Sequence, residues 1–473
     1  MRKTKIVCTL GPSSNNEDVI RQLLINGLDV ARLNFSHGTY DEHKKTIDTF
    51  RKVRDEMKVP AAVLLDTKGP EIRIGLVENG SCVLLKGTKF TFTTVDCVCT
   101  SERACVTYSK LPSQVKPGTT VLVDDGKIIL TVDECTENDV ICTVIEGGEL
   151  KSRKSINIPN THLDMPYLSE KDENDLLFGI ENDVDFVAAS FVRCKEDVIA
   201  LRKFLDYHGG HDIRIISKIE NIEGVNNFDE ILENSDGIMV ARGDMGVEVE
   251  FERLPGIQKM MIKKCYQSGK MVITATQMLE SMITSFTPTR AEISDVANAV
   301  FDGTSAVMLS GETAMGAHPA RVVEVMAKIV EQAESDAFAM HAYIGIRYDV
   351  DKNDVTNAVC DAACTTARDL KCKAVIAVTT SGTTARRVSK FRPFEPIVAS
   401  TPEVKTYHQL SLSWGVFPVL AINQDDETKL FRHAIDCAKQ IDIVANGDTV
   451  VIIAGVPLKM AGTTNIIKVE VVK

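Results

Sequence analysis

The chain has 473 residues, 44% of them hydrophobic and 25% charged. It is too long for one compact core and should divide into about three globular domains. A net charge of −12 and a pI near 5.4 exclude a global basic surface for nucleic acid. No apolar run approaches the roughly 18 residues of a membrane helix, so we expect a cytoplasmic protein that binds neither membrane nor nucleic acid.

The 13 cysteines are scattered through the predicted strands and helices, as small apolar residues usually are. Two close pairs, Cys97 with Cys99 and Cys360 with Cys364, lack the second pair of Cys or His ligands that a zinc site needs. We therefore interpret the cysteines as reduced thiols that serve in packing.

The first 70 residues alternate between strand and helix patterns, which indicates βα units and a parallel sheet. The predicted strands span 5–11, 30–38 and 61–69, and the predicted helices span 16–29 and 40–57. Alternate residues of a strand share one face, so Arg32, Asn34 and Ser36 should face the same side. Asp66 and Thr67 follow the apolar run of the third strand.

Residues 70–166 differ in character, because short β-type runs are separated by turn sequences such as KPG and DDG without a helical period. We predict a small all-β domain, a β-barrel, inserted into the α/β domain. Turn residues at both junctions would allow it to move as a lid, and a passive appendage is the alternative.

The βα alternation resumes at residue 167. Eight predicted strands end near Gly11, His37, Gly69, Phe191, Glu220, Gly243, Gln277 and Glu312. The later helices are expected at 175–184, 197–209, 228–236, 257–270, 291–303 and 321–335. Eight βα units predict an α/β fold of the (β/α)8 TIM-barrel type, formed by residues 1–69 and 167–345.

A lysine and two carboxylates lie where apolar runs of this barrel end. Lys218 and Glu220 should share one strand face, and Asp244 follows the next apolar run. Two carboxylates and an ammonium suit a hard metal ion that holds an anionic substrate, whereas a structural ion pair is the alternative. The active site of a TIM barrel lies at the carboxyl ends of its strands, which favours the functional interpretation.

Residues 346–473 form a further α/β domain in the prediction. Helices are expected at 356–370, 383–391 and 427–440, and strands at 374–380, 396–400, 416–421, 449–455 and 466–472. The turn TTSGTTARR (Thr379–Arg387) joins a strand to a helix and could hold an anion at the helix N-terminus. Ordinary N-capping by Ser or Thr is the alternative.

Eight motifs, taken together, resemble the pyruvate kinase family: ARLNFSHG, LLDTKGPEIR, ASFVR, ISKIEN, MVARGD, ITATQMLESM, PTRAE and MLSGET. The resemblance runs from residue 5 to the C-terminus and is closest to bacterial members without the extra C-terminal extension. It implies the barrel, the inserted lid and the C-terminal regulatory domain in this order. It also implies transfer of the phosphoryl group of phosphoenolpyruvate to ADP, giving pyruvate and ATP in the last step of glycolysis.

The resemblance implies two cation sites. Glu220 and Asp244 would hold Mg²⁺ or Mn²⁺, and Lys218 would face the phosphoryl group during its transfer. Potassium would be held by Asn34, Ser36, Asp66 and Thr67. Because potassium-dependent members resemble this chain in carrying Glu at the position of Glu71, we expect potassium dependence.

Further roles follow by the same resemblance. Arg32 and Arg73 would contact phosphate, Arg73 on the nucleotide, and Lys154 would reach the nucleotide from the lid. His37 would contact nucleotide or would only be structural.

Gly243, Asp244 and Thr276 would lie against the substrate carboxylate. We expect Thr276 on the same strand face as Thr274. Thr276, together with Ser310 and Glu312, is also a candidate for the water chain that protonates enolpyruvate.

The C-terminal turn corresponds to the family's effector pocket, with Thr379, Ser381, Gly382 and Thr384 as the predicted ligands. Some members carry Lys or Arg where this chain has Thr383, so a sugar phosphate, a nucleotide or no effector is left open. Trp414 and residues 461–465 are expected to border this pocket, and the family implies a homotetramer.

Two alternatives are considered: within enzymes, a Mg²⁺-dependent aldolase-like barrel, and from a different class, a metabolite-binding regulator that has lost catalysis. The aldolase would not require the LNFSH and DTKGPEIR sites, and the regulator would be expected to have lost Lys218, Thr276 or Arg73. All of these are intact.

Overall fold

The computed structural model describes residues 1–340, 354–456 and 464–473. Its central domain is a closed barrel of eight parallel strands in the order β1-β17-β16-β15-β14-β13-β3-β2. These strands are β1 (Lys5–Thr9), β2 (Val30–Asn34), β3 (Ala62–Asp66), β13 (Phe186–Ala189), β14 (Arg214–Ile219), β15 (Gly237–Ala241), β16 (Met271–Ala275) and β17 (Ala306–Leu309). The predicted TIM barrel is confirmed.

Period-two patterning explains why these segments form a barrel. Alternate residues such as Leu64, Ile216 and Met239 fill its interior, whereas their neighbours Leu65, Ile215 and Ile238 pack outward against the helices. A one-residue shift in any strand would turn its interior set outward. The register therefore fixes which polar side chains emerge at the carboxyl ends.

Helices surround the barrel. They are α1 (Glu17–Asn26), α2 (Tyr40–Met57), α4 (Glu170–Glu181), α5 (Lys195–Tyr207), α7 (Phe228–Asn234), α9 (Leu254–Ser268), α10 (Arg290–Phe301) and α12 (Pro319–Ala339). Three short helices that the sequence did not predict follow strands directly: α6 (Ile222–Asn226), α8 (Arg242–Glu248) and α11 (Gly311–Ala314). A 3-10 turn, η2 (Glu280–Ile283), follows β16. The strand β15 ends at Ala241, two residues before the predicted end near Gly243, and the chain turns directly into α8.

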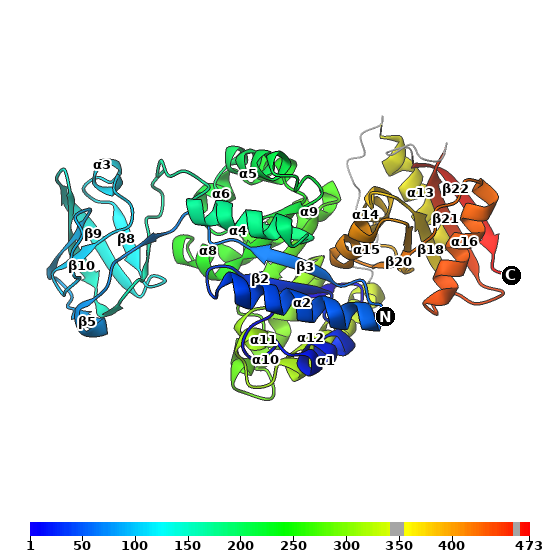
Figure 1. Cartoon of the computed structure of the whole chain (residues 1–473), viewed down its shortest axis with the longest axis horizontal. Coiled ribbons are helices and arrows are strands. Elements are labelled where there is room, and N and C mark those ends of the chain that lie inside the picture. The colour runs from blue at the N-terminus through cyan, green and yellow to red at the C-terminus, as the bar shows by residue number, and fades with distance from the viewer. Residues whose placement is uncertain (341–353, 457–463) are drawn as a thin grey trace.

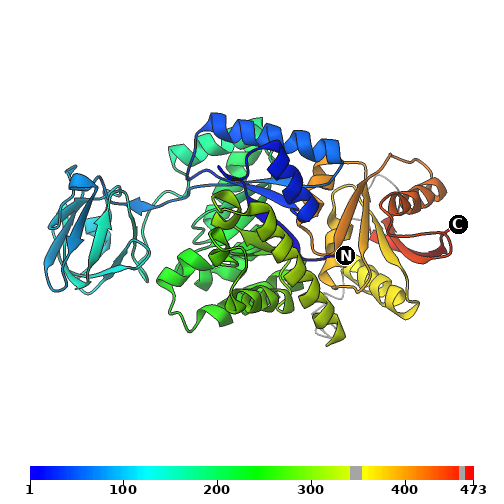
Figure 2. The same ribbon diagram turned by 90° about the horizontal axis from the view of Figure 1, so that it is seen from below.

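The inserted segment is all-β apart from one turn of helix, α3 (Leu111–Gln114), and the 3-10 turn η1 (Glu78–Gly80). Seven strands pair in the order β4-β12-β8-β9-β10-β6-β7, and β11 pairs with β5. The strands are β4 (Ile72–Arg73), β5 (Ser81–Leu84), β6 (Lys89–Thr93), β7 (Arg103–Cys105), β8 (Thr120–Val123), β9 (Ile128–Cys135), β10 (Asp139–Glu146), β11 (Gly148–Lys151) and β12 (Ser155–Asn157). Figures 1 and 2 show this inserted domain, called the lid below, standing out from one end of the barrel on two connecting segments.

The C-terminal domain lies at the opposite end (Figure 1). Its sheet has the order β20-β19-β18-β21-β22, with β22 antiparallel at the edge. The strands are β18 (Ala374–Val378), β19 (Ile397–Thr401), β20 (Val416–Leu420), β21 (Thr449–Gly455) and β22 (Thr464–Val471). The helices are α13 (Val355–Asp369), α14 (Thr383–Lys390), α15 (Val404–Gln409), which was not predicted, and α16 (Glu427–Gln440), with the 3-10 turn η3 (Leu410–Leu412) after α15.

The N-terminal segment joins the barrel to the C-terminal domain. Buried Lys3 donates from Nζ to Pro393 O at 2.8 Å and lies 5.3 Å from the ring of Trp414. Trp414 is 1% exposed and packs against Ala337 of α12. It does not line the cleft beside Ser381 but lines a small adjoining cavity together with Arg386. Residues 461–463 of the expected border lie outside the described residues.

All 13 cysteines are free thiols. In the described parts of the chain, no helix is long and apolar enough to cross a membrane.

Candidate active site

Lys218 lies at the centre of a buried polar cluster at the carboxyl ends of β3, β13 and β14. Its Nζ donates to Asp66 Oδ1 at 3.0 Å and to Ser190 Oγ at 2.7 Å, and lies 2.9 Å from Glu220 Oε1. Its strand neighbour Ser217 points outward, with its hydroxyl 2.7 Å from Ser235 Oγ behind the barrel wall. The alternation predicted for β14 therefore brings Lys218 and Glu220 together.

Asp66 pairs with a second cation. Arg32 Nε donates to Asp66 Oδ2 at 2.6 Å, so both carboxylate oxygens are engaged. Burial acts to raise the pKa of Asp66, but the charges of Arg32 and Lys218 outweigh it and hold that pKa below its ordinary value. Burial likewise opposes the charge on Lys218, while Asp66 and Glu220 raise its pKa, so the ammonium stays protonated.

Glu220 and Asp244 are carboxylates whose charges are poorly compensated. Burial raises the pKa of Glu220 to about 7, with Asp244 and Asp66 adding to the rise and Lys218 opposing it. Burial also raises the pKa of Asp244, in the first turn of α8, where Lys218 opposes and the lid residue Asp125 contributes. Glu220 Oε2 accepts from the backbone N–H of Phe191 at 2.6 Å.

These two carboxylates fit a divalent cation. Both are hard oxygen donors whose ionised forms burial disfavours, and a cation between them would relieve that cost. Among the described residues, no group of three or more His, Cys, Asp or Glu side chains could hold a metal ion by itself. Such an ion would therefore need further ligands from water or an anionic substrate, as Mg²⁺ sites usually do.

The four residues predicted to hold potassium lie on neighbouring strands. Asn34 pairs with Asp66 across β2 and β3. Asn34 Oδ1 accepts from Ser36 N at 3.1 Å, and Thr67 Oγ1 accepts from Ser190 N at 3.2 Å. Asp66 already binds two cationic side chains, so it would share its oxygens with any potassium ion. Glu71 lies nearby with its Oε2 2.6 Å from Arg73 Nε.

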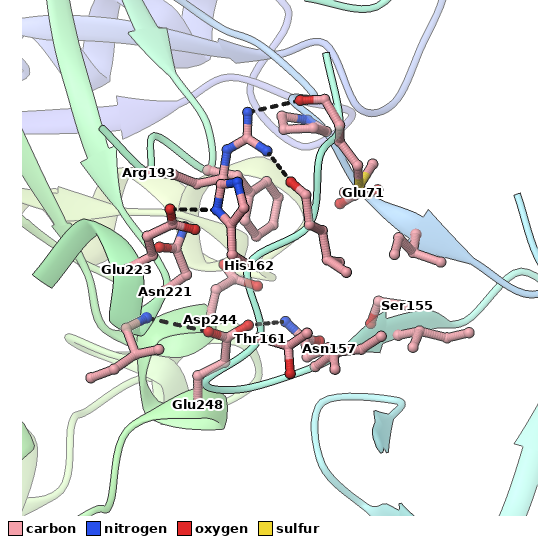
Figure 3. Close-up of a pocket in the computed structure, with 18 of the residues that line it drawn as sticks. Glu71, Ser155, Asn157, Thr161, His162, Arg193, Asn221, Glu223, Asp244 and Glu248 are labelled. Carbon is pink, nitrogen blue, oxygen red and sulfur yellow. Dashed lines mark hydrogen bonds and ion pairs between the residues drawn. The ribbon is translucent and has the colours of Figure 1, made fainter. Parts of the chain in front are cut away.

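The nucleotide candidates are less closely assembled. Lys154 Nζ lies 2.7 Å from Asp124 Oδ1 within the lid. Arg73 Nη1 donates to Arg153 O at 2.8 Å, also within the lid. His37 is exposed, and its backbone carbonyl contacts His43 Nε2 at 2.8 Å. Of these three, only Arg73 lines the cleft of about 470 Å³ between lid and barrel, shown in Figure 3.

Thr276 contacts Gly243 just beyond the end of β16, in an arrangement that strand alternation did not predict. The strand β16 ends at Ala275, and Thr276 has a left-handed φ of 69°. Its Oγ1 accepts from Gly243 N at 2.8 Å. Thr274 instead points outward, with its hydroxyl 2.9 Å from Thr304 Oγ1. The expectation that Thr274 and Thr276 share a face is wrong, because the positive φ breaks the two-residue alternation.

The other water-chain candidates have structural partners. Glu312 is fully buried, and its carboxylate accepts from Ser310 N at 2.7 Å and Leu279 N at 3.2 Å. Burial raises its pKa. These contacts order the turn into α11 next to Thr276.

Sequence reasoning missed two residues of the cluster. Ser190 contacts Lys218 and also donates to Thr67 O at 2.7 Å. Thr9 Oγ1 accepts from Arg32 Nη1 at 2.8 Å. Both lie at the carboxyl ends of barrel strands, so the strand-end rule that drew attention to Asp66 could have found them.

The C-terminal turn has two groups of hydroxyls. Those of Thr379 and Thr384 are engaged, by Gly382 N at 2.9 Å and by Thr464 Oγ1 at 2.8 Å. Ser381 is exposed and lines a cleft of about 810 Å³ between the C-terminal domain and the barrel.

Arg386 faces the same cleft. Its pKa is lowered to about 9 by burial and by Arg214, and its Nη1 has no hydrogen-bond partner in the described residues. Arg214 of the barrel lines the cleft from the other side and pairs with Asp236 at 2.7 Å.

Comparison with known proteins agrees with this geometry. The family model "Pyruvate kinase, barrel domain" matches residues 1–323, and "Pyruvate kinase, alpha/beta domain" matches residues 357–470. A protein of Clostridium acetobutylicum named pyruvate kinase is 46% identical over 474 residues and both chains are covered completely. One of Clostridium perfringens is 45% identical, over 99% of this chain and all of the relative. One of Staphylococcus haemolyticus is 46% identical, over all of this chain and 81% of the relative.

Proposed function

The chain belongs to the pyruvate kinase family, and we propose that the Lys218 cluster performs the family's reaction, transfer of the phosphoryl group of phosphoenolpyruvate to ADP. The observation that carries the proposal is the buried Lys218 ammonium, held by three oxygens at the carboxyl end of the barrel. Phosphoryl transfer depends on positioning and charge neutralisation, and a fixed, permanently protonated cation supplies both.

Each side chain has a proposed part. Lys218 and Arg32 bind the phosphoryl oxygens, with Asp66 keeping both cations oriented. Glu220 and Asp244 would hold Mg²⁺ or Mn²⁺, which supplies charge neutralisation at the phosphoryl group and substrate carboxylate when bound. Gly243 and Thr276 orient the substrate carboxylate, and Thr276 Oγ1 positions the proton that enolpyruvate takes up.

Two further assignments concern the edges of the site. Asn34, Ser36, Asp66 and Thr67 would hold K⁺, which would add positive charge beside the phosphoryl group. Arg73, Lys154 and His37 would contact the nucleotide. The position of Lys154 in the lid supports a role that requires lid movement, since its present partner is Asp124.

Regulation is proposed at the cleft between the C-terminal domain and the barrel. A phosphorylated effector, a sugar phosphate or a nucleotide, fits the hydroxyls and the buried guanidinium of Arg386. Thr379, Ser381, Gly382 and Thr384 would form its cradle, with Ser381 in contact and the other three shaping the turn. We propose a cytoplasmic homotetramer, as the family resemblance implies.

One assay tests the proposal: pyruvate formation from phosphoenolpyruvate and ADP with Mg²⁺, with and without K⁺. We expect turnover that is abolished by chelation of Mg²⁺ and falls at least about tenfold without K⁺. No turnover in either buffer would contradict the reaction. Equal turnover in both would contradict only the potassium assignment.

A further inference from the structure

Glu248 joins the lid to the two barrel elements that carry the proposed metal ligands (Figure 3). Its Oε1 accepts from Asn157 Nδ2 at 3.2 Å, and its Oε2 accepts from the backbone N–H of Ile222 at 3.2 Å. Asn157 is the last residue of β12 in the lid, and Ile222 begins α6 two residues after Glu220. One carboxylate of α8 therefore contacts two other elements, β12 and α6.

On the barrel side, these contacts fix the two metal carboxylates relative to each other. Glu248 lies four residues after Asp244 in α8, and residues four apart share one side of a helix. Its bond to Ile222 N holds α8 against the segment that leaves Glu220. A shift of α8 away from β14 would break this bond.

On the lid side, Glu248 holds the strand that follows Lys154. The strand β12 begins at Ser155, so Asn157 lies three residues after Lys154. Further along the same connection, His162 Nδ1 lies 2.9 Å from Glu223 Oε1, but that side chain is exposed. The contact of Asn157 with Glu248 is closer in the chain to Lys154 and is partly buried.

We propose that Glu248 is a positioning residue for phosphoryl transfer, setting the Lys154 strand of the lid relative to Glu220 and Asp244. Glu248 itself touches no reacting atom. The inference rests on the proposed metal and nucleotide assignments and concerns the geometry between them.

Two substitutions that exchange the charged and the neutral side chain between positions 157 and 248 test this proposal. Asn157→Asp places two carboxylates against each other and should push β12 away from α8. Glu248→Gln should be mild, because the Asn157 amide can rotate and accept from the new amide. In the double variant, Gln at 248 donates to Asp at 157 and still accepts from Ile222 N. Both bonds therefore return, the first with donor and acceptor exchanged and the second unchanged. Asn160→Asp adds the same charge to the same cleft and is the matched control.

We expect Asn157→Asp to lower kcat/KM for ADP about tenfold, through a higher KM for ADP and a lower kcat. KM for phosphoenolpyruvate should stay within about twofold. The double variant and Asn160→Asp should each lie within about threefold of the unsubstituted enzyme. The proposal would be overturned if Asn157→Asp kept normal kinetics or if the double variant were no more active than Asn157→Asp. An equal loss of kcat/KM in Asn160→Asp would also overturn it. Turnover by the unsubstituted enzyme tests the reaction separately, and thermal unfolding shows that each variant is folded.

Discussion

At the scale of single residues, burying the charges around Lys218 costs free energy when the chain folds. Removing one partner of a buried ion pair typically costs about 3–5 kcal/mol, and well-packed apolar residues often replace such pairs without loss. Arg32 and Lys218 face three carboxylates, those of Asp66, Glu220 and Asp244. An arrangement with excess negative charge suits a site that binds a cation better than one that serves stability alone.

Ser190 offers a mild test of this cluster. We expect Ser190→Ala to lower kcat about tenfold, because Lys218 loses a charge-assisted hydrogen bond of about 1.5 kcal/mol and becomes less well oriented. Ser217→Ala on β14, whose hydroxyl contacts Ser235 outside the barrel, is the control and should keep normal turnover. Steady-state kinetics measures both. Equal rates for the two variants would remove Ser190 from the site.

At the scale of elements, the two segments that connect lid and barrel are held by different groups. In the outgoing connection, the backbone N–H of Gly69 donates to Asp172 Oδ1 of α4 at 2.9 Å. The returning connection is anchored by Arg193, whose guanidinium donates to Leu163 O at 3.1 Å and Met165 O at 3.0 Å while pairing with Asp197. Two backbone carbonyls of the returning segment therefore depend on one guanidinium.

We expect Arg193→Met to loosen that segment, since two backbone carbonyls lose their donor. Limited proteolysis should then cut the chain near residues 158–166 several times faster than in the unsubstituted protein. Lys195→Met removes an exposed lysine from the neighbouring turn of α5 and should leave the cleavage rate unchanged. An unchanged rate for Arg193→Met would mean that other contacts hold this connection.

The sequence predicted those elements whose local pattern decides their structure. The barrel strands, most of the long helices and the shared face of Lys218 and Glu220 follow from hydrophobic period and parity. The short helices α6, α8 and α11 were missed because they span only four to seven residues and lie between strong patterns. Thr276 was misplaced because a positive φ is a property of the tertiary setting. Contacts across domains, such as Asn157 with Glu248, leave no local pattern.

At the scale of the whole molecule, the end of the barrel that carries the Lys218 cluster lies toward the lid, and the opposite end lies toward the C-terminal domain (Figure 2). Lys3 is one of the anchors at this second junction. Burial lowers the pKa of Lys3 to about 8, although Glu334 and Glu395 oppose the shift. A charged group held in a buried junction makes the stability of the assembled molecule depend on pH.

The sign of that dependence follows from linkage. Below about pH 8 both the folded and unfolded chains carry the Lys3 proton, and the cost of burying the charge is complete. Between pH 8 and 10.5 the folded chain releases this proton first, so the free energy of unfolding gains up to roughly 3 kcal/mol from this group. The destabilisation that Lys3 causes relative to Lys3→Met should therefore shrink as pH rises.

Thermal unfolding across this pH range measures the difference between Lys3→Met and the unsubstituted protein. The exposed Lys373→Met is the control for removal of a lysine from the same region. A pH-independent difference for Lys3→Met would contradict the assigned pKa direction.

We propose that the whole arrangement of barrel and lid serves the buried Lys218 ammonium. The most direct test of this claim is single-turnover phosphoryl transfer by Lys218→Met, with phosphoenolpyruvate binding measured on the same sample. We predict a rate at least about 10²-fold lower and binding weakened much less, because the ammonium stabilises charge that develops during transfer. A near-normal rate in a folded, substrate-binding Lys218→Met variant would contradict the claim.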